Sequence, residues 1–137
     1  MFNEMVAHAV EGLPNEACGV IAAHDGRPVG MFPIRNAEES PVVYRFDERE
    51  QLAVFNEVEG RGLDLLGFWH SHTHSEAYPS PTDRARAHWQ DPVGGEEVVA
   101  YPGTAYLILS LQDRANPVIR AFRFEDGAPV EEEVRIS

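Results

Sequence analysis

The chain has 137 residues, of which 43% are hydrophobic, and its formal net charge is -12 at pH 7. These values fit one domain with a single hydrophobic core. An acid excess of this size disfavours nucleic acid as a partner, because phosphate groups are repelled. No apolar run reaches the eighteen or so residues that a transmembrane helix needs, so we expect no membrane association.

The single cysteine and the first residues bear on the cellular location. Cys18 has no second cysteine with which to form an internal disulfide, as is usual in a reducing compartment. The N-terminus carries an acid early and lacks the basic segment of a secretory signal. Both observations favour a cytoplasmic protein.

The hydrophobic pattern predicts three helices. The first has apolar residues at spacings of four, which is typical of one helix face. The second has Asp47 as a candidate N-cap, with Glu50 at capping-box spacing. The third has Pro81 at its first position, which suits a helix start. The predicted helices cover residues 3–11, 47–59 and 80–89.

Runs rich in β-branched and aromatic residues predict strands between these helices. The Asp25–Gly26 pair predicts a hairpin turn between the first two strands. Leu63–His70 is strongly apolar and suits a central, buried strand. Residues 91–103 are rich in Pro and Gly and predict a long loop, with a short strand at Val98–Tyr101 left open. The predicted strands cover residues 16–23, 28–35, 42–46, 63–70, 104–111, 118–124 and 130–136.

This order of elements predicts a mixed α/β or α+β fold, with a sheet of six to seven strands flanked by about three helices. It excludes a doubly wound nucleotide-binding fold, and the sequence has no Gly-rich phosphate loop. Internal repeats and low-complexity segments are absent. We therefore expect a single domain over residues 1–137.

Two histidines follow the most apolar strand and predict a metal site. His70 and His72 are two residues apart, so their side chains leave an extended chain on the same face. Two such imidazoles can converge on one ion, and Asp83, one turn into the next helix, can supply a third ligand. Three protein ligands leave a fourth position open, which is the pattern of a catalytic rather than a structural zinc.

Each part of this set also has a simpler interpretation. A His-x-His pair at a strand end is often only polar surface. Ser80, Pro81 and Asp83 fit a capping box, with serine at the N-cap and an acid in the first turn. Capping and metal binding by Asp83 are compatible, because a ligand on a well-capped helix is well positioned. Only the joint spacing of all four residues favours a metal site.

That joint spacing, His70-x-His72-x7-Ser80-x-x-Asp83, resembles the JAMM motif of the MPN+ zinc metallopeptidases. Glu16 matches the glutamate that this family has near its first strand. The resemblance spans nearly the whole chain and implies the cytidine-deaminase-like JAMM/MPN fold. Family members usually begin with a strand before the first helix, and none is predicted here, so the expected sheet is one edge strand short.

The resemblance implies a role for each residue of the motif. One Zn²⁺ ion would be held by His70, His72 and Asp83, and it would lower the pKa of a water molecule toward about 7. Glu16 would be the general base that takes the water proton and passes it to the leaving amine. The Ser80 hydroxyl would donate a hydrogen bond to the oxyanion.

Three stretches, Glu16–Val20, Asn36–Pro41 and Glu76–Ser80, resemble one bacterial branch of the family, the Mec-type hydrolases. The resemblance implies a ubiquitin-like sulfur-carrier protein as substrate, cut between its C-terminal glycine and an attached cysteine or short tail. Two alternatives stay open: hydrolysis of another small amide or peptide, and a non-catalytic MPN scaffold. The complete ligand set and Glu16 favour an enzyme. Whether the chain forms a homodimer also stays open.

Overall fold

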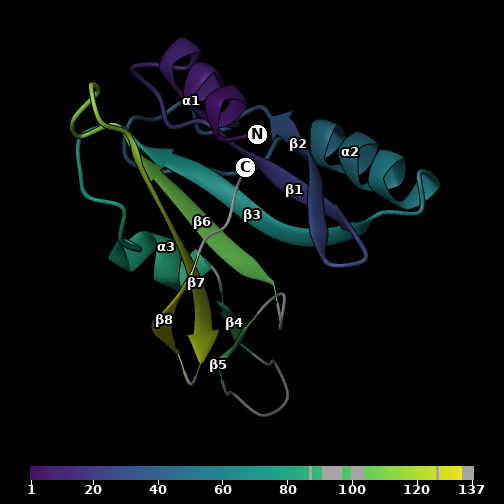
Figure 1. Ribbon diagram of the computed structural model, residues 1–137. Coiled ribbons are helices and arrows are strands. Elements are labelled where there is room, and N and C mark those ends of the chain that lie inside the picture. Colours follow the sequence, from purple (N-terminus) through teal and green to yellow (C-terminus); the bar gives the residue numbers. More distant parts are fainter. Residues whose placement is uncertain (87, 91–96, 100–103, 126, 134–137) are drawn as a thin grey trace.

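The computed structural model describes residues 1–86, 88–90, 97–99, 104–125 and 127–133 (Figure 1). Its helices are α1 (Phe2–Glu11), α2 (Glu48–Gly60) and α3 (Pro81–Arg86). Its longer strands are β1 (Cys18–His24), β2 (Arg27–Ile34), β3 (Asp64–His72), β6 (Ala105–Ser110), β7 (Val118–Glu125) and β8 (Ala128–Glu132). Two short strands, β4 (His88–Gln90) and β5 (Glu97–Val99), pair only with each other.

The longer strands form one mixed sheet in the order β2-β1-β3-β6-β7-β8. Strands β3 and β6 are parallel, and the other neighbours are antiparallel. With three helices among the described residues, this confirms the predicted mixed α+β fold. In the part of the chain that the structure describes, no helix has the length and apolar character to cross a membrane.

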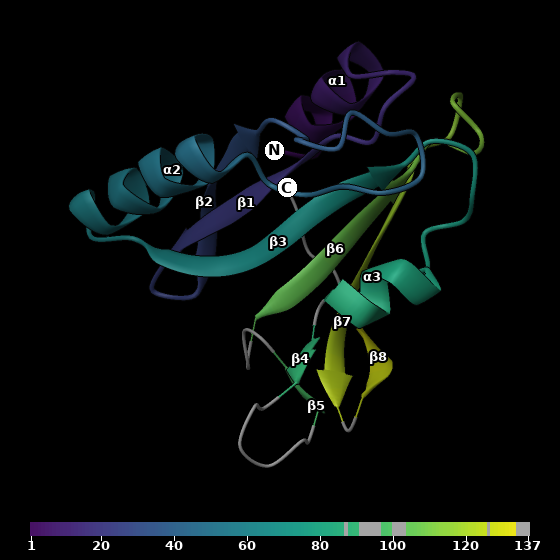
Figure 2. The same cartoon turned by 180° about the vertical axis from the view of Figure 1, so that it is seen from behind.

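The helices cover opposite faces of the sheet. Helix α1 lies in front of the sheet in Figure 1, and α2 and α3 lie in front of it in Figure 2, which shows the other side. On β3, Trp69 packs with the core residues of α1, whereas Phe68 packs with Phe55 of α2. Because side chains alternate along a strand, His70 and His72 share the face of Phe68. Both histidines therefore project from the face that carries α2 and α3.

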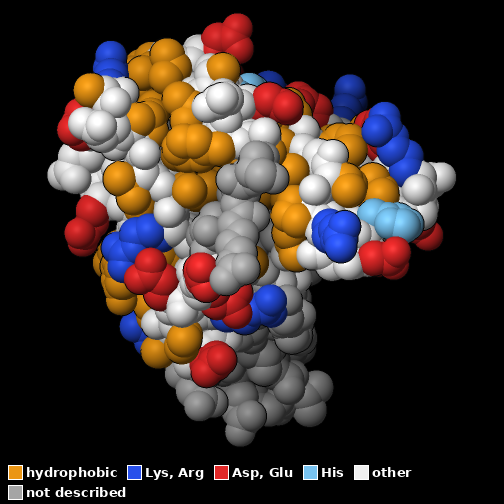
Figure 3. Space-filling view, in the orientation of Figure 1, with side chains coloured by type: hydrophobic (Ala, Val, Ile, Leu, Met, Phe, Trp, Pro, Cys, Tyr) orange, Lys and Arg blue, Asp and Glu red, His pale blue; other side chains and the backbone are white. Residues whose placement is uncertain are grey.

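Apolar side chains gather on part of the face that carries α1. In the space-filling view of Figure 3, orange side chains gather over α1 and the strands beside it. Met1, Leu66 and Leu107 contribute to a small hollow of about 130 Å³ there. The polar groups of the JAMM-like motif lie on the other side of the sheet.

Two local predictions from turn and cap residues are confirmed. Asp25 and Gly26 have φ angles of 51° and 77°, as a tight hairpin turn of the mirror-image type requires. The Asp47 side chain accepts hydrogen bonds from the backbone N–H groups of Arg49 and Glu50 and caps α2. The reciprocal half of the predicted capping box is wrong, because a Glu50 carboxylate oxygen accepts from the Arg35 N–H at 3.0 Å instead.

The predicted strand over residues 42–46 is wrong. Only Phe46 forms an isolated bridge, with Asn36, and the Val42 side chain is 69% exposed. The backbone of this segment hydrogen-bonds to the Asn36 side chain, which accepts from the Arg45 N–H and donates to the Val43 carbonyl. A buried side chain thus replaces the neighbouring strand that a ladder would need.

Four predicted boundaries also differ from the structure. Strand β3 extends through His72 rather than ending at His70, so both histidines belong to the strand. The third helix ends at Arg86, because residues 88–90 pair with 97–99 instead of continuing the helix. The strand left open at Val98–Tyr101 appears as Glu97–Val99, and its last two residues lie outside the described residues. The last strand covers 128–132, and residues 134–137 lie outside the described residues.

Candidate active site

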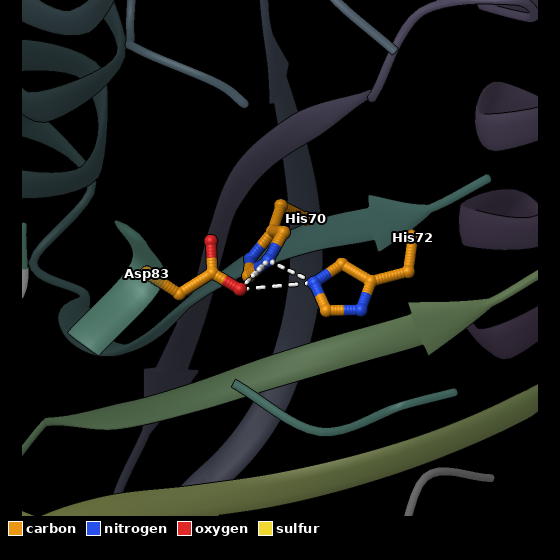
Figure 4. Close-up of side chains that lie close together, drawn as sticks. All are labelled: His70, His72 and Asp83. Atoms are coloured by element: carbon orange, nitrogen blue, oxygen red, sulfur yellow. Dashed lines mark hydrogen bonds and ion pairs between the residues drawn. The ribbon is translucent and has the colours of Figure 1, made fainter. Parts of the chain in front are cut away.

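The two histidines of β3 and the aspartate of α3 meet at one point (Figure 4). His70 Nε2 lies 3.1 Å from His72 Nε2 and 3.1 Å from Asp83 Oδ2. His72 Nε2 lies 2.9 Å from the same Asp83 oxygen. Both histidines are buried, at 3% and 4% exposure. The structure therefore brings together the three residues that the sequence predicts as metal ligands.

The spacing of these three atoms fits a small cation. Ligand atoms at 2.0–2.1 Å from a tetrahedral zinc lie about 3.3–3.4 Å apart, which is close to the 2.9–3.1 Å seen here. The His72 Nδ1–H group donates to the Glu76 carbonyl at 2.8 Å. In the neutral form of His72, this bond selects the tautomer whose Nε2 lone pair faces the other two ligand atoms.

The protonation states of the cluster depend on Asp83. Burial lowers the pKa of His70 and favours its neutral form, which is the form that ligates metals. Burial also acts to lower the pKa of His72, but hydrogen bonds with Asp83 and the Glu76 carbonyl outweigh it and raise that pKa, so a bound cation would displace a proton from His72. Burial alone would raise the pKa of Asp83, but hydrogen bonds from the two histidines outweigh it and hold that pKa well below the usual range. Asp83 is thus a buried carboxylate at neutral pH, and a bound cation would neutralise it.

The capping box predicted from the sequence is present on α3. The Ser80 hydroxyl accepts from the Asp83 N–H at 3.0 Å, and Asp83 Oδ2 accepts from the Ser80 N–H at 3.0 Å. The same oxygen faces both histidines, so the cap fixes the candidate ligand atom in place. The Ser80 O–H proton is left to donate to another group. Capping and ligation are compatible in this geometry.

Glu16 lies beside this cluster, just before β1. Cys18 pairs with His70 in the antiparallel ladder between β1 and β3, and continuing the register by two residues sets Glu16 opposite His72. The segment is held by Ser71, whose hydroxyl accepts from the Ala17 N–H at 2.8 Å. The Glu16 side chain is only 4% exposed, and its Oε1 has no hydrogen-bond partner among the described residues.

The environment of Glu16 changes its acidity. Burial raises the pKa of its carboxyl to about 8; the charge of Asp83 adds to this rise, and those of His72 and Arg86 oppose it. A group with a pKa near the working pH is well suited to accept and return a proton. A cation at the cluster would favour the carboxylate and lower this pKa.

The raised pKa predicts how metal-free protein responds to pH. Glu16 loses its proton near pH 4.5 when unfolded but only near pH 8 when folded, so its contribution to stability is lost as pH rises between these values. Glu16→Gln should therefore be more stable than wild type in chelator, with an advantage of roughly 2–4 kcal/mol by pH 8 and little at pH 4. Urea unfolding of both proteins at several pH values measures this difference. A constant difference across the range would contradict the assignment.

Two residues near the site were missed by the sequence analysis. Tyr44 stacks on His70, with ring centroids 4.4 Å apart and an interplanar angle of 21°. It also lines a groove of about 490 Å³ with Phe46, Phe68 and Arg86, among others. Asn36 is 8% exposed and donates to the Glu16 carbonyl at 3.0 Å. Asn36 lies in a segment that the sequence predicts as loop, and Tyr44 in the predicted strand over residues 42–46. The sequence pattern there does not indicate which side chains are buried.

Comparisons with known proteins identify the family of the chain. Residues 1–125 match the family described as prokaryotic homologs of the JAB domain. The chain is 38% identical to the CysO-cysteine peptidase of Mycobacterium tuberculosis, over 99% of this chain and 86% of that protein. It is 37% identical to the desampylase of Haloferax volcanii, over 82% of this chain and 77% of that protein.

A solved structure supports the fold. The solution structure of a protein from Desulfitobacterium hafniense superposes with a TM-score of 0.82 at 33% identity, covering 99% of this chain and 88% of that one. The JAMM family is zinc-dependent in general, and the cluster of His70, His72 and Asp83 could hold a metal ion. The chain belongs to the prokaryotic JAB-domain branch of the JAMM/MPN hydrolases.

Proposed function

We propose that the chain is a zinc-dependent peptidase that acts on a ubiquitin-like sulfur-carrier protein. It would hydrolyse the amide after the carrier's C-terminal glycine and release cysteine or a short tail. The relative named CysO-cysteine peptidase, which aligns along 99% of the chain, supports this substrate. The observation that carries the proposal is the meeting of two imidazoles and a carboxylate beside the buried Glu16.

The proposed roles follow from the positions of the side chains. Zn²⁺ held by His70, His72 and Asp83 would supply Lewis acidity and lower the pKa of a water molecule. Glu16 takes a proton from the attacking water and passes it to the leaving amine, a task that its raised pKa suits. Ser80 donates its free O–H to the oxyanion that forms at the scissile carbonyl. Glu16, His70 and His72 are each at most 4% exposed, so these side chains are shielded from bulk solvent.

A carrier–cysteine adduct tests the proposal directly. The adduct is incubated with zinc-loaded protein, with and without a chelator, and the products are identified by intact mass. We expect a carrier ending in glycine together with free cysteine, and no product when the metal is removed. An adduct that stays uncut in zinc-replete protein would refute this substrate. Protein that never retains stoichiometric zinc would favour the scaffold alternative.

The names of two further relatives suggest a second substrate. The relative from Haloferax volcanii is named desampylase, and one from Thermus thermophilus is named a probable TtuB-protein conjugate cleaving protease. Hydrolysis of a conjugate between a carrier and another protein is therefore the alternative reaction. Comparing kcat/KM on the cysteine adduct and on a carrier–protein conjugate separates the two. A cytoplasmic location and a single domain over residues 1–137 stay predictions. Whether the chain forms a homodimer stays open.

Ser80→Ala provides a test of the oxyanion role. The variant should lose roughly 10²–10³ in kcat, as an enzyme does when one oxyanion donor is removed. It should also lose about 1 kcal/mol of stability, because the cap of α3 is lost. Ser80→Thr keeps both the cap and the donor and should retain far more activity. A Ser80→Ala variant that melts earlier but turns over at the wild-type rate would show that Ser80 is only a cap.

A further inference from the structure

The loop between β2 and α2 contacts Glu16, His70 and helix α3. We infer that this segment, residues 36–46 and here called the site loop, fixes Glu16 relative to α3. The two positioning residues are Asn36 in the loop and Arg86 on α3. The inference rests on the proposed function for the meaning of the site. Its evidence is separate, because it comes from hydrogen bonds that involve none of the ligand atoms.

The first contact of the site loop is with the backbone of Glu16. The Glu16 N–H donates to the Ser40 carbonyl at 2.8 Å, and the Glu16 carbonyl accepts from Asn36 Nδ2 at 3.0 Å. Glu16 precedes β1, which begins at Cys18, so it lies just outside the strand. The site loop thus bonds to both backbone groups of Glu16, in the place of a neighbouring strand.

Asn36 is suited to this task because its carboxamide is fully used. Nδ2 donates to the carbonyls of Glu16 and Val43, both at 3.0 Å. Oδ1 accepts from the N–H groups of Glu38 at 3.0 Å and Arg45 at 3.1 Å. These are the four hydrogen bonds that a carboxamide commonly makes. A buried side chain satisfied in this way fixes the loop and Glu16 in one arrangement.

The second contact of the site loop is with α3. Arg86 lies three residues after Asp83, on the same side of the helix, and its Nη1 donates to the Tyr44 carbonyl at 2.6 Å. Its Nη2 lies 3.5 Å from Glu38, which also pairs with Arg45 at 3.2 Å. The Tyr44 ring stacks on His70. Arg86 therefore links α3, which carries Asp83, to Tyr44, whose ring stacks on His70.

Loss of the contact with Glu16 and loss of the contact with α3 should have different effects on kcat and on zinc affinity. This difference is the test. Asn36→Asp keeps the shape of the side chain but replaces both donors with an acceptor. We expect kcat to fall by about 10–100-fold, since a displacement of an ångström at a catalytic group can have this effect. The zinc dissociation constant, measured by competition with a chromophoric chelator, should stay unchanged. Asn116→Asp is the matched control, at an exposed turn residue whose side chain hydrogen-bonds to Asp113.

Arg86→Ala should show the opposite pattern. We expect the zinc dissociation constant to rise about tenfold, as it does when groups that support metal ligands are removed. Turnover at saturating zinc should stay much closer to wild type than in Asn36→Asp. Arg86→Lys, which can still donate to the Tyr44 carbonyl, should recover part of the lost affinity. Arg61→Ala, at the end of α2, removes an exposed arginine that pairs with Glu57 and serves as the control.

Each outcome bears on the inference. The inference would be overturned if Asn36→Asp and Arg86→Ala only lowered the melting temperature. It would also be overturned if each variant lowered zinc affinity and kcat in the same proportion. If Asn36→Asp does not fold, the uncharged Asn36→Ser provides the same measurement, with a smaller loss of kcat expected. If wild-type protein cuts no carrier substrate, the proposed function fails, whereas the rise in zinc dissociation constant for Arg86→Ala still tests the site loop.

Discussion

Replacing Glu16 by Gln is expected to lower kcat by roughly 10²–10⁴-fold while zinc stays bound. The amide keeps the size of the side chain but cannot accept the proton of the attacking water. Glu16 is not one of the three converging residues, so the variant should retain stoichiometric zinc. Turnover of the carrier–cysteine adduct and metal content measured on the same preparation check both parts of this prediction.

The expected loss of activity should come without loss of stability. A buried carboxyl with a pKa of about 8 and an oxygen without a partner among the described residues is unfavourable for folding at neutral pH. An amide at this position removes that cost, so Glu16→Gln should be inactive yet at least as stable as wild type. Such a combination is typical of functional groups that are held at the expense of stability.

A matched control separates loss of the general base from the mere loss of one negative charge. Glu59→Gln makes the same change at an exposed position near the end of α2 and should leave turnover and melting temperature unchanged. Wild-type turnover by Glu16→Gln would show that another group accepts the proton. Loss of zinc by Glu16→Gln would instead place the glutamate among the groups that hold the metal.

The sequence predicts most of the fold because its signals are local. The Asp25–Gly26 turn sets the hairpin of β1 and β2, and the Asp47 cap begins α2, as the structure confirms. The convergence of His70 and His72 also follows from a local rule, since alternate residues share a face. Asp83 was predictable only through its joint spacing with the histidines, because a capping box alone explains an acid there.

What the sequence does not predict depends on contacts between distant segments. The 42–46 segment has β-branched and aromatic residues typical of a strand, but two of its backbone groups, the Val43 carbonyl and the Arg45 N–H, bond to the Asn36 side chain. No periodicity indicates that a loop asparagine is buried and fully bonded. The helix expected to reach Trp89 ends at Arg86 because the chain then pairs with residues 97–99, and such pairing is decided by tertiary structure.

Replacing Asp83 by Asn is expected to remove most zinc and lower kcat/KM by about 10⁴-fold or more. Metal catalysis is worth several kcal/mol of transition-state stabilisation, and about 5 kcal/mol corresponds to this factor. The charge of Asp83 matters because both histidine nitrogens lie within 3.1 Å of its Oδ2. A neutral amide leaves two neutral imidazoles to hold a divalent cation without a carboxylate.

Asp83→Asn also distinguishes the two interpretations of the capping box. The oxygen of asparagine can still accept the Ser80 N–H, so a residue that only caps α3 would tolerate the change with little effect. A ligand would not, and the zinc dissociation constant should rise by at least about 10²-fold, more than for groups that merely support a ligand. Asp64→Asn, at the exposed start of β3, is the control and should bind zinc as wild type does. Stoichiometric zinc of wild-type affinity in Asp83→Asn would leave Asp83 as a helix cap, and two histidines alone would then have to hold the metal.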